Sequence, residues 1–208
     1  LLNGANISEQ IQRILPSNEV WQGCVYIVSR RSEPGKICKY SENDQFYFGS
    51  LSGNTEKQVR LLSLLTAAGI NAFNPENIID RIWKKFFRIS TAATLTSYYN
   101  LPIGKVLDLH TDDLLALADE FIAVATAMGI SFPPNSRDEI LEGQRKMPYN
   151  STTSMHSDFL KGAQTELESI TGYIVQCAKD LNIEVPCYLR MYNELKTNYT
   201  NIYNNPNN

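Results

Sequence analysis

The fold of the chain is decided by the stretch NSTTSMHSDFLKGAQTELESITG, residues 150–172. This stretch predicts a polar loop that leads into a helix, because the Ser154 hydroxyl can accept hydrogen bonds from the backbone N–H groups of a first helical turn. Steps of three and four residues place on one helical face Phe159, Gly162, Glu166 and Ile170. A carboxylate on such a small, apolar face indicates a partner, although most glutamates at a helix edge simply reach water.

The composition indicates a globular chain with a substantial core. It has 208 residues, 43% of them hydrophobic, and this length allows one or two domains. A net charge of -3 and a pI near 5.5 leave no broad basic surface, which argues against nucleic acid as a partner. No apolar run approaches the roughly 20 residues that cross a bilayer, and the first residues show no basic segment followed by an apolar one. We therefore expect a cytoplasmic protein without a membrane partner.

Neither cysteine nor histidine spacing indicates a metal site. The four cysteines include no Cys-x-x-Cys pair, so we expect reduced thiols. The two histidines, His110 and His156, have no second ligand nearby in the sequence. The sequence therefore predicts no metal.

The first part of the chain alternates between strand and helix patterns. Residues 1–4 look like the tail of a buried strand that turns at Asn3, with no strand body ahead of it. Strand formers at 24–28, 36–40 and 46–49, with a Pro34-Gly35 turn between the first two, predict a small sheet. Helices are predicted over 8–15 and 55–68, the second ending at Gly69, and a short strand over 71–73. None of the 11 glycines forms a Gly-x-Gly-x-x-Gly or Walker loop, so the chain alone should not bind a dinucleotide tightly.

Beyond residue 75 the pattern changes to long helices. An apolar line over residues 78–92 includes Lys85, which either extends its ammonium to water along its methylene stem or has a chemical role. The run 90–97 is small and hydroxyl-rich, so another helix can approach it closely. Further helices are predicted over 111–128 with a stop at Gly129, over 137–145, from Ser154 to near 182, and from Pro186 onward. We expect a bundle-like helical domain, joined to the sheet near residues 74–78, and disorder at 204–208.

The order of these separated motifs resembles the ketopantoate reductases, the 2-dehydropantoate 2-reductase family. Its strongest parts are the Trp-x-Lys helix at 83–85 and the Ser-Met, Asp and Thr-Glu positions within 154–166. The resemblance implies an α+β fold with a partial α/β Rossmann-type subdomain. Residues 1–75 would be the second half of an NADP-binding domain, without its glycine-rich first half. Residues 76–208 would be an all-helical domain of the 6-phosphogluconate dehydrogenase C-terminal-like type.

The resemblance also implies an activity and a set of site residues. Members of the family reduce 2-dehydropantoate, a small 2-oxo acid, to pantoate with NADPH, on the route to pantothenate and coenzyme A. Transferred by position, Lys85 becomes the general acid that protonates the ketone oxygen as hydride reaches its carbon. Glu166 would orient Lys85 or bind the polar end of the substrate, and Ser154 and Ser151 would bind the substrate. Asn3 would lie near both the nicotinamide and the substrate. A homodimer is compatible with the family.

Several positions depart from the family pattern. Ile89, Ala93 and Ile103 stand where better-known members have asparagine, and Ser151 also replaces an asparagine. These changes affect substrate contacts, so the 2-oxo acid that is accepted can differ. Two alternatives remain open: a related NAD(P)-dependent 2-oxo acid reductase, and a non-enzymatic helical interaction module, which the missing glycine loop suggests. Taken alone, the chain is expected to bind NADPH weakly and to be inactive.

Overall fold

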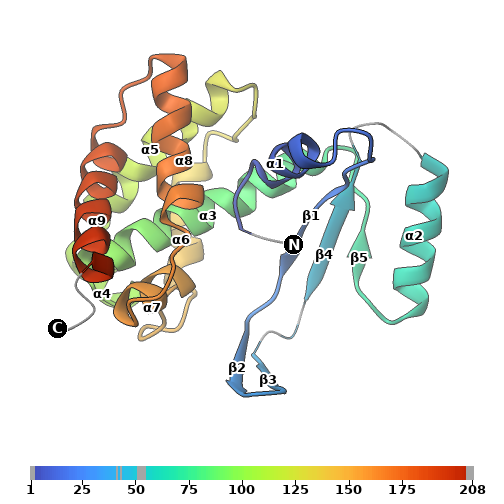
Figure 1. Ribbon diagram of the computed structural model, residues 1–208, viewed down its shortest axis with the longest axis horizontal. Coiled ribbons are helices and arrows are strands. Elements are labelled where there is room, and N and C mark those ends of the chain that lie inside the picture. Colours follow the sequence, from blue (N-terminus) through green and yellow to red (C-terminus); the bar gives the residue numbers. More distant parts are fainter. Residues whose placement is uncertain (1–2, 41, 43, 51–54, 205–208) are drawn as a thin grey trace. The chain divides into compact units, whose positions relative to one another are not determined.

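The computed structural model describes residues 3–40, 42, 44–50 and 55–204. These residues form a mostly helical α+β protein (Figure 1), so the expected fold class is confirmed. The chain divides into two compact units, residues 1–82 and 83–208. The division falls inside the long helix α3 (Ile78–Tyr99). The assignment of residues 1–75 and 76–208 to a cofactor domain and a helical domain stays a prediction.

A three-stranded sheet forms the centre of the first unit. Strand β4 (Gln45–Gly49) pairs antiparallel with β1 (Gln22–Tyr26) and parallel with β5 (Ala72–Phe73), and therefore lies between them (Figure 1). Helix α1 (Ile7–Ile14) precedes β1, and α2 (Thr55–Ala67) precedes β5. One buried cluster of this unit contains Cys24, Tyr47, Ile78 and Ile82.

The Pro34-Gly35 turn leads into the strand expected at 36–40, but the strand before the turn is not the expected one. Gly35 has φ +79°, and the turn connects β2 (Ser29–Glu33) to β3 (Lys36–Lys39) in an antiparallel hairpin. The strand expected over residues 24–28 pairs with β4 instead. Strand β2 reads Ser-Arg-Arg-Ser-Glu, and a polar strand lacks the apolar alternation that marks a half-buried one. Apolar spacing therefore could not reveal β2.

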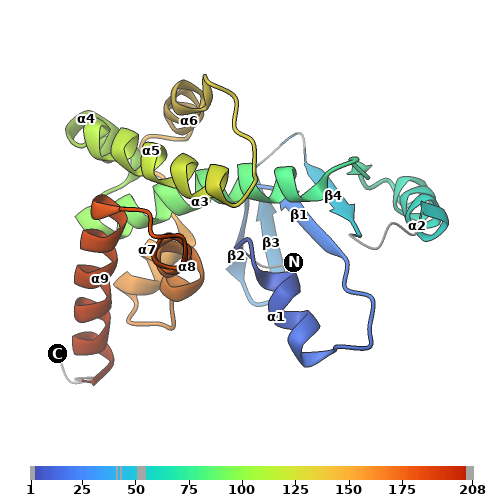
Figure 2. The same cartoon turned by 90° about the horizontal axis from the view of Figure 1, so that it is seen from above.

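The second unit is helical. After α3 it contains, in order, α4 (Ile103–Leu109), α5 (Thr111–Ala127), α6 (Ser136–Arg145), α7 (Ser154–Leu160), α8 (Leu167–Leu181) and α9 (Pro186–Asn204). Figure 2 shows α6 on one side of α3, and α7 and α8 on the other. Helix α5 supplies much of the core, as its apolar stripe predicted; its fully buried residues include Leu114, Leu117, Phe121 and Val124.

Glycine stops end two helices where the sequence predicts. Gly69 and Gly129 have φ +76° and +81°, a backbone conformation that residues with a side chain rarely adopt. After α2, the N–H of Ile70 donates to the carbonyl of Leu65, and that of Gly69 donates to Thr66. The same pair of bonds follows α5. This Schellman arrangement satisfies carbonyl groups that the helix itself leaves unpaired.

The helix expected from Ser154 to near residue 182 is two helices, and that prediction was wrong. Gly162 has φ +60° and ends α7. The N–H of Ala163 donates to Asp158 and that of Gly162 to Phe159, the same Schellman pair that ends α2 and α5. Residues 161–166 then separate α7 from α8. Because the helix is interrupted, positions 159, 162, 166 and 170 do not share one helical face.

The remaining expectations have mixed outcomes. Helix α9 begins at Pro186, and α8 ends at Leu181 with the left-handed Asn182 (φ +54°) as its C-cap, both in agreement with the predicted ends. The short helix α4 was not predicted. Of the terminus expected to be disordered, residues 205–208 lie outside the described residues. All four cysteines are thiols.

Within the residues that the structure describes, no helix combines the length and apolar character needed to cross a bilayer. No group of three or more His, Cys, Asp or Glu side chains in these ranges is arranged to hold a metal ion.

Candidate active site

Buried hydroxyl groups hold the other helices of the second unit against α3. The Thr94 hydroxyl lies 2.8 Å from that of Thr171 on α8, and Ser90 Oγ lies 3.0 Å from the Tyr188 hydroxyl on α9. Small side chains allow this close approach, so the prediction that the run 90–97 is central is confirmed. The buried hydroxyl residues of this run are Ser90, Thr91, Thr94, Thr96 and Ser97.

Thr96 connects α3 to the start of α7. Its Oγ1 donates to the Ala92 carbonyl at 2.8 Å and lies 2.9 Å from Thr153 Oγ1. A hydroxyl has one hydrogen, so Thr153 is the donor between the two threonines. Thr153 Oγ1 also accepts from the His156 N–H at 3.3 Å, which makes Thr153 the N-cap of α7. The expectation that Ser154 caps this helix was wrong by one residue.

His156 is buried between the loop that precedes α7 and the C-terminal end of α3. Its Nε2 lies 2.8 Å from Asn100 Oδ1, and its Nδ1 contacts the Thr152 hydroxyl. Because Asn100 Oδ1 can only accept, Nε2 carries the hydrogen and Nδ1 accepts from Thr152. Burial lowers the pKa of His156 below its ordinary value of 6.5, which favours this neutral ring.

Helix α4 fixes the same loop from another side. The carbonyls of Tyr149 and Ser151 accept from the N–H groups of Gly104 and Ile103, each at 2.9 Å. These donors lie in the first turn of α4, where a helix has no internal acceptor for them. The Tyr149 hydroxyl donates to Asp108 at 2.6 Å. Segment 149–153 is therefore held by α3 and by α4.

Lys85 lies on α3 at the border between the buried face and the solvent. It is half-buried, whereas Trp83 and Phe86 beside it are buried and Lys84 is exposed. A lysine at such a border can direct its ammonium toward solvent or toward a bound molecule. Its role as a general acid stays a prediction.

The two residues on α3 that replace asparagines of the family pattern differ in burial. Ile89 is half-buried, and Ala93 is only 1% exposed. Neither side chain offers a polar group, so contacts that an asparagine would supply must come from elsewhere.

Glu166 is half-buried at the N-cap position of α8 rather than on a helical face. Its carbonyl accepts from Ile170 N–H at 2.9 Å and from the Ser169 hydroxyl at 3.1 Å. It belongs to the same unit as Lys85, and its pairing with Lys85 stays a prediction.

The other predicted residues lie in three different settings. Ser154 is exposed at the first position of α7. Ser151 is half-buried, and its hydroxyl donates to the Pro148 carbonyl at 2.6 Å, so it presents an acceptor rather than a donor. Asn3 is half-buried in the first unit, ahead of α1. Their roles in binding stay predictions.

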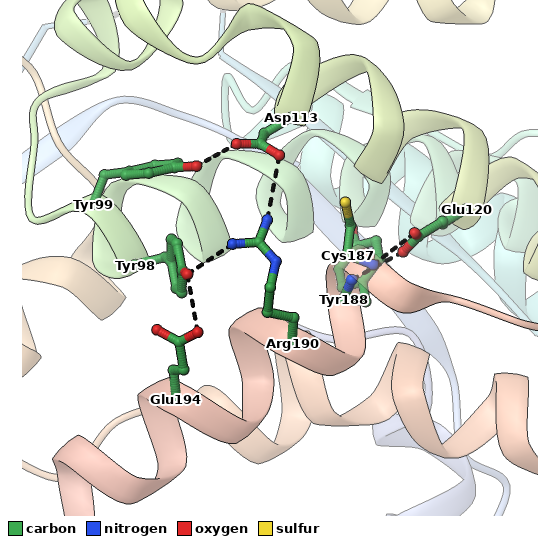
Figure 3. A network of polar contacts seen from close by, with 8 residues as sticks. All are labelled: Tyr98, Tyr99, Asp113, Glu120, Cys187, Tyr188, Arg190 and Glu194. Atoms are coloured by element: carbon green, nitrogen blue, oxygen red, sulfur yellow. Dashed lines mark hydrogen bonds and ion pairs between the residues drawn. The ribbon is translucent and has the colours of Figure 1, made fainter.

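A second polar cluster attaches α9 to α3 and α5 (Figure 3). The Arg190 guanidinium donates to the Tyr98 hydroxyl at 2.7 Å and to Asp113 at 3.3 Å. Asp113 also accepts from the Tyr99 hydroxyl, and burial with this contact raises the pKa of Tyr99 to about 12. The Tyr98 hydroxyl donates to Glu194 at 3.1 Å. Each group has a partner within the cluster, so we interpret it as structural.

Glu120 on α5 caps the start of α9. Its two carboxylate oxygens accept from the backbone N–H groups of Cys187 and Tyr188 at 2.7 and 2.9 Å (Figure 3). Burial raises the pKa of this carboxyl despite both bonds. A carboxylate at a helix start satisfies unpaired donors and opposes the positive end of the helix dipole.

Sequence reasoning missed the polar network around His156. The run of hydroxyl residues at 90–97 was a usable signal for Thr96. No local pattern links Asn100 to His156, because the two are 56 residues apart.

Comparison with models of known protein families identifies the family to which this chain belongs. The family model "Ketopantoate reductase PanE/ApbA C terminal" matches residues 77–199, and "Ketopantoate reductase PanE/ApbA" matches residues 1–53. The chain belongs to the ketopantoate reductase family. The resemblance read from the motifs is thereby confirmed.

Individual members of the ketopantoate reductase family agree. A crystal structure of 2-dehydropantoate 2-reductase from Porphyromonas gingivalis W83 is 42% identical, with a TM-score of 0.78, and the match covers 94% of this chain and 62% of that one. A 2-dehydropantoate 2-reductase from Pyrococcus abyssi is 33% identical over 78% of this chain and 55% of its own length. The chain thus spans less than two thirds of either relative.

A second solved structure shows the fold alone. It is a ternary structure of D-mandelate dehydrogenase with NADH and anilino(oxo)acetate, 19% identical with a TM-score of 0.85, covering 97% of this chain and 67% of that one. The architecture of this family therefore also occurs in a dehydrogenase with a different substrate.

Proposed function

We propose that this chain supplies the substrate-reducing part of an NADPH-dependent 2-dehydropantoate 2-reductase, which forms pantoate for pantothenate and coenzyme A synthesis. The single observation that carries the proposal is the half-buried Lys85, on the central helix of a unit that matches the C-terminal model of the ketopantoate reductases. A homodimer in the cytoplasm is part of the same prediction.

The role proposed for Lys85 is that of a general acid, which donates a proton to the substrate. As hydride reaches the ketone carbon, the carbonyl bond opens and negative charge develops on its oxygen. The Lys85 ammonium stabilises that charge and transfers a proton to the oxygen, which leaves a hydroxyl group and a neutral amine. Exchange with solvent restores the ammonium, and the position of Lys85 at the solvent border suits that step.

The other predicted residues bind and orient the substrate. Ser154 is exposed, so its hydroxyl can donate to the substrate carboxylate. Glu166, half-buried in the same unit, orients the Lys85 ammonium or accepts from a substrate hydroxyl. Asn3 is assigned to the nicotinamide and the substrate by the family resemblance alone.

NADPH supplies the hydride when it is bound. The phosphate groups of a dinucleotide need a glycine-rich loop at a helix N-terminus, and this sequence contains no such loop. The residues present therefore serve the substrate, and only Asn3 is assigned to the cofactor. We expect the chain alone to bind NADPH weakly, as measured by fluorescence titration, and tight binding would contradict this division of roles.

A second candidate is a reductase for a different 2-oxo acid. Ile89 and the buried Ala93 favour it, because neither offers the polar contact of an asparagine. The likeness to D-mandelate dehydrogenase supports the same alternative at the level of fold. A non-enzymatic helical interaction module is the third reading.

One assay separates these functions. The complete gene product is incubated with NADPH and a panel of 2-oxo acids, and loss of NADPH absorbance is followed. The proposal predicts the highest kcat/KM with 2-dehydropantoate. Preference for another 2-oxo acid favours the second candidate, and no turnover with any of them favours the interaction module.

A further inference from the structure

A directed chain of hydrogen bonds joins the loop before α7 to the end of α3. The His156 N–H donates to Thr153 Oγ1, the Thr153 hydroxyl donates to Thr96 Oγ1, and the Thr96 hydroxyl donates to the Ala92 carbonyl. Each hydroxyl donates once and accepts once, so the direction of the chain is fixed by its final carbonyl acceptor. Such a chain is intact only when the loop has one position relative to α3.

The His156 ring adds a second connection between the same two segments. Nε2–H donates to Asn100 Oδ1 at 2.8 Å, and Nδ1 contacts the Thr152 hydroxyl. Thr152 and Thr153 are consecutive residues between Ser151 and Ser154, and both are therefore tied through His156 to α3.

Asn100 has two separate roles at this point. It is left-handed at φ +53°, and the N–H of Leu101 donates to the Thr96 carbonyl, which closes the end of α3. Its side chain at the same time accepts from His156. The place where the helix ends thus also fixes the histidine.

We propose that His156 is a positioning residue, which holds the substrate-binding segment 151–154 at a set place relative to the helix that carries Lys85. This inference rests on the proposed function for the roles of Ser151, Ser154 and Lys85. The segment is a loop, and loops hold a binding group less accurately than helices unless side-chain bonds fix them. His156 supplies those bonds from within the fold and itself does not touch the substrate.

Two substitutions break the network without deleting the histidine. Asn100→Gly removes the acceptor for Nε2–H and keeps a residue that adopts positive φ readily. Thr96→Val removes the hydroxyl that binds Thr153 and keeps the side-chain shape. Asn100→Asp is the conservative variant, because its carboxylate still accepts from Nε2–H.

Thr91→Val is the matched control for Thr96→Val. Both threonines are 0% exposed on α3, and both donate to a carbonyl of their own helix. The Thr91 contacts are to Phe87 and Arg88, within α3, whereas Thr96 also contacts the loop. A difference between the two variants therefore reports the loop contact.

The experiment measures steady-state kinetics with the 2-oxo acid that the complete gene product reduces, and amide hydrogen exchange over residues 150–154. We expect Asn100→Gly and Thr96→Val to raise KM about tenfold, the scale of one lost hydrogen bond, with kcat changed less than about twofold. Exchange over 150–154 should accelerate by a similar factor. Thr91→Val should change neither, and Asn100→Asp should restore KM toward that of the parent.

Two results would overturn the proposal. If amide exchange over residues 150–154 is unchanged in both Asn100→Gly and Thr96→Val, the hydrogen-bond network does not hold the segment. Faster exchange with an unchanged KM means that the position of the segment does not matter for the substrate. If no 2-oxo acid is reduced, the proposed function fails, and the exchange measurement alone decides whether His156 holds the segment.

Discussion

Gly104 and Tyr149 are packed so closely that a Cβ atom at position 104 would lie 2.2 Å from Cδ2 of the Tyr149 ring. The backbone bond between the same residues, from Gly104 N–H to the Tyr149 carbonyl, is 2.9 Å long. The start of α4 and the loop before α7 are therefore in direct contact at a position where any added side chain would displace the Tyr149 ring.

Gly104→Ala should destabilise the protein. A methyl group cannot fit unless the Tyr149 ring moves, and overpacking of this kind costs about 1–3 kcal/mol in the free energy of unfolding. Urea unfolding measures the loss. Gly143→Ala is the control, because its nearest neighbour, Arg88 Nε, lies 3.7 Å from the added Cβ, and alanine is the better helix former by about 1 kcal/mol. An equal loss in a Tyr149→Ala background would show that the ring is not the cause.

His156 should make stability depend on pH. Burial lowers its pKa in the folded protein below 6.5, so the unfolded chain takes up a proton that the folded one resists. The contribution of His156 to the free energy of unfolding is fully present at pH values above the pKa of its ring in the unfolded chain. It is lost as the pH falls through 6.5 toward the lower pKa of the ring in the folded protein. The parent should therefore lose stability relative to His156→Gln between about pH 7.5 and about pH 5.5. Urea unfolding across this range tests it, and parallel pH profiles would contradict it.

Glu120→Ala should weaken the attachment of α9. The substitution leaves the N–H groups of Cys187 and Tyr188 without their carboxylate acceptor, at a cost of about 1–3 kcal/mol in unfolding free energy. Glu120→Gln keeps one acceptor oxygen and should lose less. Glu194→Ala removes an exposed carboxylate and should change stability by less than about 0.5 kcal/mol. An equal loss of unfolding free energy in Glu120→Ala and Glu194→Ala would show that the Glu120 cap does not stabilise α9 more than an exposed carboxylate does.

The helix ends show how far local signals in the sequence extend. Gly69, Gly129 and Asn182 follow long apolar stripes, so each was recognised as a stop, and each has a positive φ. Gly162 uses the same Schellman bonds, but α7 has only 7 residues and carries no stripe of its own. The apolar spacing of α8 was therefore extended back across residues 161–166, which separate α7 from α8. A short helix gives the same local pattern as the start of a long one.

The residues of the candidate site also differ in whether a local sequence signal reveals them. Lys85 and the hydroxyl run were recognised because each is unusual for its position on α3. The contact of the His156 ring with Asn100 joins residues 56 apart, and no spacing within one element predicts it. Strand β2 was missed for a related reason, since its polar sequence has no alternating apolar residues.

The central claim is that Lys85 protonates the ketone as it is reduced, and turnover by the complete gene product tests it most directly. With NADPH and saturating 2-dehydropantoate, Lys85→Ala should lower kcat by at least about a hundredfold, the usual scale for a lost general acid. Lys84→Ala, which removes the neighbouring exposed ammonium, should keep kcat within about twofold. An unchanged kcat in Lys85→Ala, or an equal loss in both variants, would contradict the account.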